Sequence, residues 1–275
     1  MAVACVNGHK WECVMGKIHI GTSGYSYADW RGVFYPKDLP QKEMLQYYTR
    51  IFDCVELNFT YYGIPNPRVI AAMVRNTPAG FLFTVKANEA TTHKQDPSVL
   101  APFRSAIDPA RAAGRLAGVL CQFPWGFKNT EHNRAYLASL AKELGDYRLI
   151  VEFRNESWIR PAIFDFLRQH RLAYCSVDEP SLPGLVPRLA KATGDMAYVR
   201  FHGRNKAKWF AGSDKERYDY LYSDEELKEF LPEIGKMSKE AMKTYVFFNN
   251  CHAGSAAVNA TEFKRMLAQL GLLQM

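Results

Sequence analysis

The 275-residue sequence lacks several features that would assign it at once to a broad class. No apolar run approaches the ~20 residues that a membrane-spanning helix needs, so no membrane association is expected. No low-complexity tract or linker-like stretch divides the chain. The GTSG motif at residues 21–24 lacks the spacing of a dinucleotide-binding fingerprint. These absences leave an ordinary globular chain without a recognisable cofactor loop.

Cysteine is too sparse for a disulfide framework, with six residues in the whole chain. Cys54, Cys121 and Cys175 fall inside apolar segments, and Cys251 follows the last of those segments. We therefore expect these four side chains to be reduced thiols, a pattern typical of the cytoplasm.

The first residues carry no motif that indicates a site. Cys5, His9 and Cys13 do not have a standard metal-ligand spacing and lack a fourth ligand, so no zinc site is predicted. The segment also lacks the apolar stretch and small-residue cleavage pattern of a secretory signal. We interpret residues 1–17 as a disordered or non-native extension and residues 18–275 as a single domain.

Charge favours an acidic partner without requiring one. The net charge is +7 and the isoelectric point is about 9.0, while 48% apolar and 23% charged residues are ordinary for a globular protein. Such an excess is compatible with a small anionic ligand or a nucleic acid, although many enzymes share it.

Strand-like and helix-like segments alternate along the whole chain. Apolar, β-branched or aromatic segments typical of buried strands lie at residues 18–23, 54–62, 81–87, 116–123, 149–153, 172–178, 196–204 and 244–249. Helical patterns lie between most of them, at residues 40–52, 66–74, 97–114, 130–145, 161–167, 223–234 and 263–270. In the third helical segment, Pro102 and Pro109 are expected to interrupt the helix. The alternation predicts a parallel sheet, and about eight units in this length predict an α/β fold of the TIM-type (β/α)8 barrel class. An open doubly wound sheet is the alternative.

Polar residues recur where the predicted strands end. Barrel enzymes place their chemistry at the carboxyl ends of the strands, so we expect these residues to converge on one polar mouth. The set comprises Glu56, Asn58, Lys86, Gln122, Glu152, Arg154, Asp178, Arg200, His202, Arg204, Asn249 and Asn250. Within it, Arg200, His202 and Arg204 alternate along one predicted strand and would share a face.

Residue chemistry suggests different roles within this set. Carboxylates and imidazole suit acid–base work, so the candidate catalytic residues are Glu56, Glu152, Asp178 and His202. The remaining residues of the set, together with Trp158, are candidate ligand-binding residues. Aromatic residues that follow strand ends could stack a base or sugar, or could plug the top of the barrel, namely Trp30, Tyr61, Tyr62, Trp125, Trp158 and Trp209.

Several longer motifs resemble those of one family. These are GTSGYSYADWRGVFYP, FDCVELNFTYYGIP, FTVKANEATTH, CQFPWGF, VEFRNESW, VRFHGR, YDYLYSDEEL and FFNNCHAGSAAVNA. In this order, over about residues 18–270, the chain resembles the domain-of-unknown-function 72, or YecE-like, family. Tyr25 stands where the family usually has Trp, and Phe59 stands where it has a small residue. The resemblance implies a TIM-barrel fold and no established reaction.

Four functional interpretations remain open. The first is an enzyme or binder for a phosphate-bearing ligand, a nucleotide or nucleic acid, held by Lys86, Arg154, Arg200 and Arg204. The second is a carbohydrate hydrolase or isomerase that uses Glu56, Glu152 and Asp178. The third is a divalent-metal barrel in which His202 joins these carboxylates, although no compact ligand motif supports it, and no cofactor or metal is predicted. The fourth is a non-catalytic scaffold with an internal ion-pair network. The sequence favours the first and leaves the oligomeric state undetermined.

Overall fold

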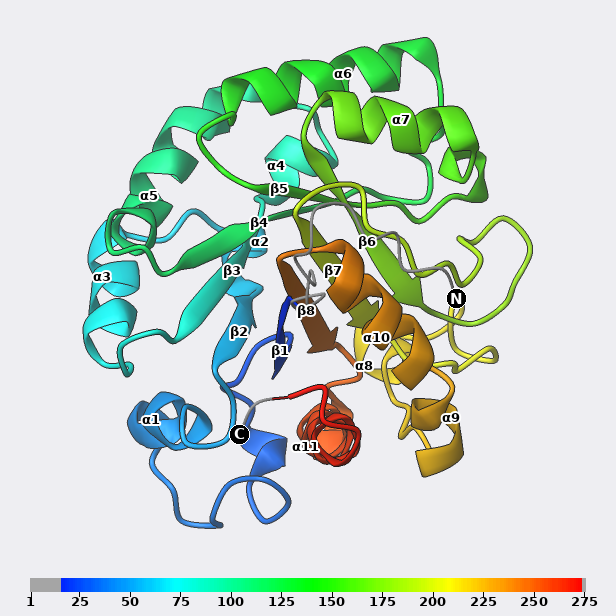
Figure 1. The fold of residues 1–275 in the computed structure, drawn as a ribbon. Coiled ribbons are helices and arrows are strands. Elements are labelled where there is room, and N and C mark those ends of the chain that lie inside the picture. Colours follow the sequence, from blue (N-terminus) through cyan, green and yellow to red (C-terminus); the bar gives the residue numbers. More distant parts are fainter. Residues whose placement is uncertain (1–15, 274–275) are drawn as a thin grey trace, which may run out of the picture.

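Eight parallel strands form one nearly closed ring in the computed structural model, which describes residues 16–273 except the side chains of Asp214 and Lys215. The order around the ring is β1-β8-β7-β6-β5-β4-β3-β2, and helices surround it (Figure 1). The strands are β1 (Lys17–Thr22), β2 (Cys54–Leu57), β3 (Leu82–Lys86), β4 (Leu116–Gln122), β5 (Leu149–Glu152), β6 (Leu172–Asp178), β7 (Met196–Phe201) and β8 (Lys243–Phe248). A parallel bridge between Ser23 and Glu56 joins β1 to β2 and brings the ring close to closure. The predicted single-domain (β/α)8 barrel is confirmed, and the interpretations of residues 1–15, Cys5, His9 and Cys13 included, lie outside the described residues.

Helices and short turns connect the strands. The α-helices are α1 (Met44–Tyr48), α2 (Phe59–Tyr62), α3 (Pro67–Arg75), α4 (Glu89–Thr92), α5 (Leu100–Ala112), α6 (Glu131–Glu143), α7 (Pro161–Gln169), α8 (Asp214–Arg217), α9 (Asp224–Lys228), α10 (Leu231–Glu240) and α11 (Ser255–Gln269). The 3-10 turns are η1 (Ala28–Trp30), η2 (Gln41–Glu43), η3 (Pro97–Val99), η4 (Glu156–Trp158) and η5 (His252–Gly254). Local capping explains several starts, because Asn66 accepts from the Arg68 amide at α3, and Ser223 with Glu226 forms a capping box at α9.

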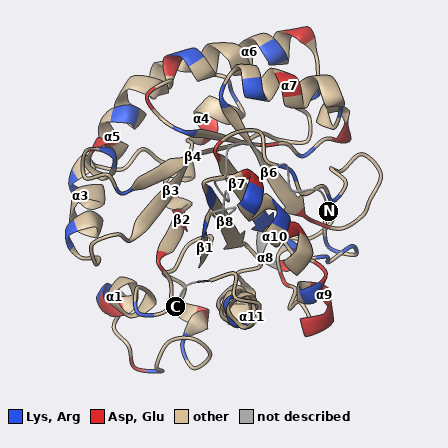
Figure 2. Cartoon of the chain, viewed as in Figure 1, with Lys and Arg blue, Asp and Glu red and all other residues tan. Residues whose placement is uncertain are grey.

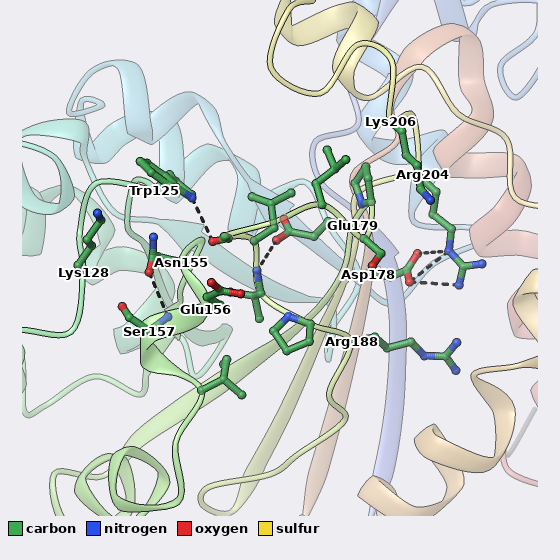
Figure 3. Close-up of a pocket in the computed structure, with 18 of the residues that line it drawn as sticks. Trp125, Lys128, Asn155, Glu156, Ser157, Asp178, Glu179, Arg188, Arg204 and Lys206 are labelled. Atoms are coloured by element: carbon green, nitrogen blue, oxygen red, sulfur yellow. Dashed lines mark hydrogen bonds and ion pairs between the residues drawn. The ribbon is translucent and has the colours of Figure 1, made fainter.

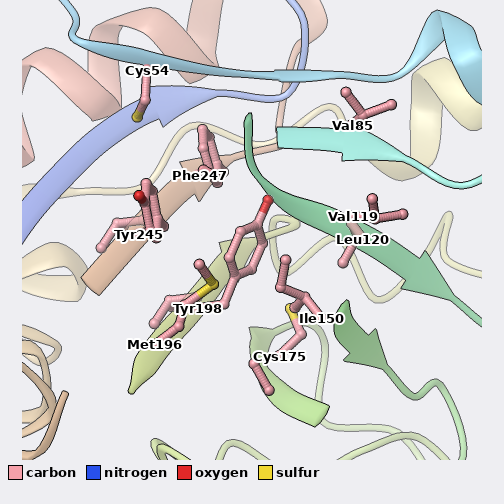
Figure 4. Packing of buried hydrophobic residues seen from close by; sticks show 14 of the residues in the cluster. Cys54, Val85, Val119, Leu120, Ile150, Cys175, Met196, Tyr198, Tyr245 and Phe247 are labelled. Atoms are coloured by element: carbon pink, nitrogen blue, oxygen red, sulfur yellow. The ribbon is translucent and has the colours of Figure 1, made fainter. Parts of the chain in front are cut away.

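The interior of the barrel is packed with side chains. Tyr198, Tyr245, Phe247 and Ile150 are at most 1% exposed and pack in the interior of the ring (Figure 4). The four cysteines outside the first 15 residues are free, and Cys54, Cys121 and Cys175 are buried, as expected. Because the interior is filled, a ligand can approach the strand-end residues only from the mouth.

Several local expectations were wrong. The predicted strand at residues 54–62 ends at Leu57, and helix α2 follows because the Thr60 hydroxyl donates to the Leu57 and Lys86 carbonyl oxygens at 3.2 and 2.6 Å. The last predicted residues of β7 leave the sheet, since Gly203 adopts a φ of 90° and its amide donates to Tyr222. Helix α5 is continuous through Pro109.

Helix α1 is also shorter than the predicted helix at residues 40–52.

Among residues 16–273, no helix is long and apolar enough to cross a membrane. In the view of Figure 2, Lys and Arg are interspersed with Asp and Glu over the outer helices and do not form one basic face.

Candidate functional site

A buried ion-pair network occupies the carboxyl-terminal end of the barrel. At its centre, Arg200 of β7 places one terminal nitrogen 2.7 Å from Glu56 of β2 and the other 2.6 Å from Glu152 of β5. Ser23 accepts a further contact from Arg200 at 3.3 Å, and the Tyr198 hydroxyl donates to Glu56 at 2.7 Å. Three strands far apart in the sequence are thus held together by one guanidinium.

The network continues through Arg154 to a carboxylate that the sequence interpretation missed. Arg154 lies 2.7 Å from Glu152 through Nε and 2.8 Å from Glu179 through Nη1. Glu179 follows Asp178 directly, and strict alternation from the inward-facing Cys175 would have assigned Glu179 to the barrel interior. We call Glu56, Glu152, Arg154, Glu179 and Arg200 the inner network.

Burial and pairing set the charge states of the inner network. Burial opposes ionisation of Glu152, yet Arg154 and Arg200 hold the pKa of its carboxyl well below the ordinary value. The same attractions raise the pKa of Arg200 although burial disfavours its charge. Burial raises the pKa of Glu179 to about 7 against the opposing effect of Arg154. Glu179 is therefore the member whose charge changes near neutral pH.

His202 lies beside the inner network in its neutral form. Its Nδ1 accepts from the Asn249 amide at 3.0 Å, so the ring proton sits on Nε2, which lies 3.2 Å from Glu152 without a hydrogen-bonding angle. Burial, with Arg154 adding to it, lowers the pKa of His202 to about 3. The imidazole is fully enclosed and is not presented to a ligand.

A second network lies outside the strands, between β6, β7 and α9. Arg204 contacts Asp178 through Nε at 2.9 Å and reaches Glu226 and Glu229 at 3.2 Å each. The Tyr222 hydroxyl donates to Asp178 at 2.6 Å. We call these five residues the outer network; its members range from buried to half exposed.

The expectation of one convergent mouth is therefore met only in part. Glu56, Glu152, Arg154, Arg200, His202 and Asn249 come together as predicted. Asp178 and Arg204 do not join them, because successive side chains of a strand point to opposite faces and Asp178 points outward, away from the face of Glu179.

Lys86 differs from the arginines because no carboxylate pairs with it. Its ammonium lies 4.1 Å from the centroid of the Tyr61 ring and makes no hydrogen bond or ion pair among the described residues. Burial, with the nearby Arg200 adding to it, lowers the pKa of Lys86 to about 8.

The remaining predicted polar residues occupy separate positions. Asn58 precedes α2, and its Oδ1 is buried without a described partner. Gln122 donates to the Phe123 carbonyl oxygen at 3.3 Å. Asn250 is fully buried and ties the 219–222 segment to α11 through Tyr220 and Asn259.

The tryptophans divide between packing and exposure. Trp158 is fully buried, stacks on Phe153 at 4.3 Å and donates to the Phe127 carbonyl oxygen, so it lies in the wall and offers no face to the mouth. Trp30 is likewise buried, and Trp209 is buried against Arg154. Trp125 is 45% exposed.

A surface pocket of about 1100 Å³ opens beside the inner network (Figure 3). Loops after β4, β5, β6 and β7 line it, with Glu179 and Asp178 on one side and Trp125 at the edge. The Trp125 indole donates to the Gly184 carbonyl oxygen at 3.0 Å, which fixes the ring there. The charged lining residues are Lys128, Arg160, Arg188, Arg204 and Lys206 and the acids Glu156, Asp178, Glu179 and Glu229.

Two kinds of cation line this pocket. Arg188 and Arg204 are paired with carboxylates. Lys128, Arg160 and Lys206 have no carboxylate partner within the described part of the chain, and Arg160 donates only to the Ser157 carbonyl oxygen. Apart from Lys86, the cations of the mouth that lack a carboxylate partner among the described residues therefore lie at this rim and not in the inner network.

The four residues considered for a divalent metal do not assemble into one site. Asp178 belongs to the outer network, and Arg200 already bridges Glu56 and Glu152. Within residues 16–273 no group of three or more His, Cys, Asp and Glu side chains is arranged to hold a metal ion.

Comparison with known proteins places the chain in one family. The family described as "Protein of unknown function DUF72" matches residues 19–274. The UPF0759 protein YunF of Bacillus subtilis (strain 168) is 32% identical over 91% of this chain and 94% of its own length. A DUF72 family protein of Thermotoga maritima MSB8 superposes with a TM-score of 0.86 at 45% identity, over 92% of this chain and 99% of that chain.

A DUF72 family protein of Enterococcus faecalis V583 gives a TM-score of 0.82 at 29% identity, over 91% of this chain and 95% of that one. The family match and the structural matches thus cover nearly the same part of this chain. The chain belongs to the DUF72 family.

Proposed function

We propose that this barrel binds a small phosphate-bearing ligand, a nucleotide, in the pocket beside the inner network. The observation that carries the proposal is the rim formed by Lys128, Arg160 and Lys206, whose cations have no carboxylate partners among the described residues. Ammonium and guanidinium groups donate several hydrogen bonds to phosphate oxygens. The arginines that the sequence analysis favoured for this role, Arg154 and Arg200, are already paired, so the proposal does not use them.

Trp125 supports the nucleotide as the ligand class. Its ring is 45% exposed at the edge of the pocket, and the Lys128 ammonium lies 5.1 Å from its centroid. A base stacked on this ring would place its phosphate toward the cationic rim. Stacking on an aromatic side chain contributes about 1–3 kcal/mol per base.

Glu179 supplies the acid–base group of the proposal. It lines the pocket, its side chain is 1% exposed, and its carboxylate is held by Arg154 and by the Val186 amide at 3.3 Å. With a pKa of about 7, both of its protonation states are populated near neutral pH, as general acid–base catalysis requires. Glu179 replaces Asp178 as the candidate catalytic carboxylate, and hydrolysis of a phosphate ester is the reaction class that this arrangement suits.

Calorimetric titration tests the binding proposal with inorganic phosphate and adenosine monophosphate as probes. Lys128→Ala and Lys206→Ala should each weaken the binding of both probes by about 1–2 kcal/mol, roughly five- to thirtyfold in Kd. Binding should also weaken as salt rises, because the rim is exposed to solvent. Lys236→Ala on α10 is the matched control, since it removes the same charge outside the pocket.

The variant Trp125→Ala distinguishes the contribution of the base from that of the phosphate. It should weaken the binding of adenosine monophosphate and leave the binding of inorganic phosphate unchanged. Absence of binding by the native protein, or equal weakening by Lys236→Ala and Lys206→Ala, contradicts the proposal and favours the carbohydrate interpretation.

A further inference from the structure

A lysine, a tyrosine and a histidine form a cluster that the proposed pocket does not use. Lys86 ends β3, and its ammonium lies 4.1 Å from the centroid of the Tyr61 ring on α2. The Tyr61 hydroxyl lies 3.3 Å from Nε2 of His93, whose Nδ1 lies 2.9 Å from the Thr92 hydroxyl. All three side chains are half-buried.

Lys86 lies next to the buried inner network but lacks an anionic partner within the described part of the chain. Glu56 of the neighbouring strand pairs in register with Thr84, and Thr84 shares the face of Lys86, so the amine extends one step beyond the Glu56 level toward the mouth. Both nearby carboxylates, Glu56 and Glu152, are taken by Arg200. The amine is left without an anionic partner among the described residues and beside two buried guanidinium groups.

We propose that Lys86 is an imine-forming amine that captures an aldehyde or ketone entering the mouth on the β3 side. A lysine amine becomes a nucleophile when it is desolvated and lies near other cations. Tyr61 lies beside the amine and can exchange a proton with the adduct, and His93 contacts the Tyr61 hydroxyl. This inference goes beyond the nucleotide pocket and does not depend on it.

The reaction balances without a cofactor. The lone pair of the Lys86 Nζ attacks the carbonyl carbon, and a proton moves from nitrogen to the carbonyl oxygen to give a carbinolamine. The Tyr61 hydroxyl donates a proton to that hydroxyl, which releases water and leaves a protonated imine. The imine then returns this proton to the Tyr61 oxygen. The overall change is amine plus carbonyl compound to imine plus water.

Free amine is available at Lys86 near neutral pH. Burial lowers the pKa of Lys86 to about 8, and Arg200 contributes in the same direction. An exposed lysine with an ordinary pKa has on the order of a hundredfold less free amine at pH 7. Lys128, exposed above Trp125 at 5.1 Å, is the matched comparison because it also lies over an aromatic ring.

Reductive trapping of the native full-length protein tests this inference. The protein is incubated with glyceraldehyde and sodium cyanoborohydride at pH 7, and adducts are quantified for each lysine by peptide mass spectrometry. Cyanoborohydride supplies the hydride that converts the imine to a stable secondary amine. We expect labelling of Lys86 at least about tenfold faster than that of Lys128, with a rate that rises through pH 8.

Two variants make the result specific. Lys86→Arg keeps the cation and should abolish the fast labelling phase, whereas Lys236→Arg, at an exposed lysine of α10 outside the pocket, should leave that phase unchanged. Labelling of Lys86 at or below the rate of exposed lysines overturns the inference. Glyceraldehyde carries no phosphate, so failure of the nucleotide proposal would leave this outcome unaffected.

Discussion

The inner and outer networks use the same residue types in opposite settings. In the inner network, the Glu56, Glu152 and Arg200 side chains are at most 2% exposed. In the outer network, the Arg204 side chain is 23% exposed and that of Glu229 is 46% exposed. The two networks diverge at consecutive residues of one strand end, because Asp178 and Glu179 point to opposite faces.

This difference separates two kinds of electrostatic contribution. A buried pair attracts strongly because little solvent screens it, but removing one partner leaves an uncompensated charge in a poor solvent for ions. An exposed pair is screened by water and salt and contributes little. The inner network therefore fixes the geometry of the mouth, whereas the outer network fastens α9 and its neighbours to the barrel.

The largest expected effect comes from removing the shared carboxylate of the inner network. Glu152→Ala leaves Arg200 and Arg154 each with one partner fewer, inside the barrel. We expect the free energy of unfolding to fall by about 3–5 kcal/mol. Urea denaturation followed by circular dichroism measures it, and a loss below about 1 kcal/mol would show that the network is not desolvated as described.

Acid should destabilise the protein through His202. Its pKa in the folded protein is about 3 against an ordinary value of 6.5, so between these values the unfolded chain binds a proton that the folded chain does not. Stability is therefore lost as pH falls from 6.5 toward 3, on the order of 3 kcal/mol between pH 7 and pH 4. Urea titrations of the native protein and His202→Asn at both pH values measure the difference, and an equal acid loss in the variant would contradict it.

Glu179 should change the pH dependence of stability in the direction opposite to that of His202. Its raised pKa of about 7 means that its contribution is complete below its ordinary pKa of 4.5 and is lost as pH rises through 7. Glu179→Gln should therefore flatten the dependence of stability on pH between 5 and 8 while leaving the acid loss due to His202 in place. The same pair of titrations, extended to pH 8, separates the two groups.

A smaller effect is expected in the outer network. Arg204→Ala removes a two-point contact with Asp178 but leaves the hydrogen bond from Tyr222, and solvent reaches the site. We expect a loss of about 1–2 kcal/mol. If this variant proves as damaging as Glu152→Ala, the contrast between the two networks is wrong.

The smallest effect is expected for Arg188, which reaches Glu229 at 2.6 Å from the surface. Arg188→Ala should change the free energy of unfolding by at most about 1 kcal/mol, and by less in high salt. Thermal unfolding at low and high ionic strength measures both quantities. A large loss that salt does not diminish would indicate that the contact of Arg188 with the Phe230 ring, at 3.8 Å, carries the effect.

The sequence predicts the frame of the site well because strand ends follow from apolar runs. Glu56, Glu152 and Arg200 were identified in this way, and the structure joins them. The sequence predicts less well which face of the sheet a side chain points to, because an error of one residue at a strand end reverses the face. Glu179 was missed for that reason, and Asp178, which was expected to converge with these residues, pairs with Arg204 instead.

Loops and aromatic residues were the least predictable part. Whether an indole stacks a ligand or fills the wall depends on a carbonyl oxygen elsewhere in the chain. Trp158 donates to Phe127 and Trp30 donates to Cys251, contacts that no local pattern reveals. The unpaired rim of Lys128, Arg160 and Lys206 likewise arises from three different loops.

A crystal structure of the protein soaked with adenosine monophosphate tests the central claim most directly. We expect density for the base against Trp125 and for a tetrahedral phosphate in contact with Lys206 and Lys128 or Arg160, with Glu179 nearby in the pocket. We also expect that Arg200 keeps its contacts with Glu56 and Glu152. A pocket without nucleotide density, or a phosphate that displaces these carboxylates from Arg200, would contradict that claim.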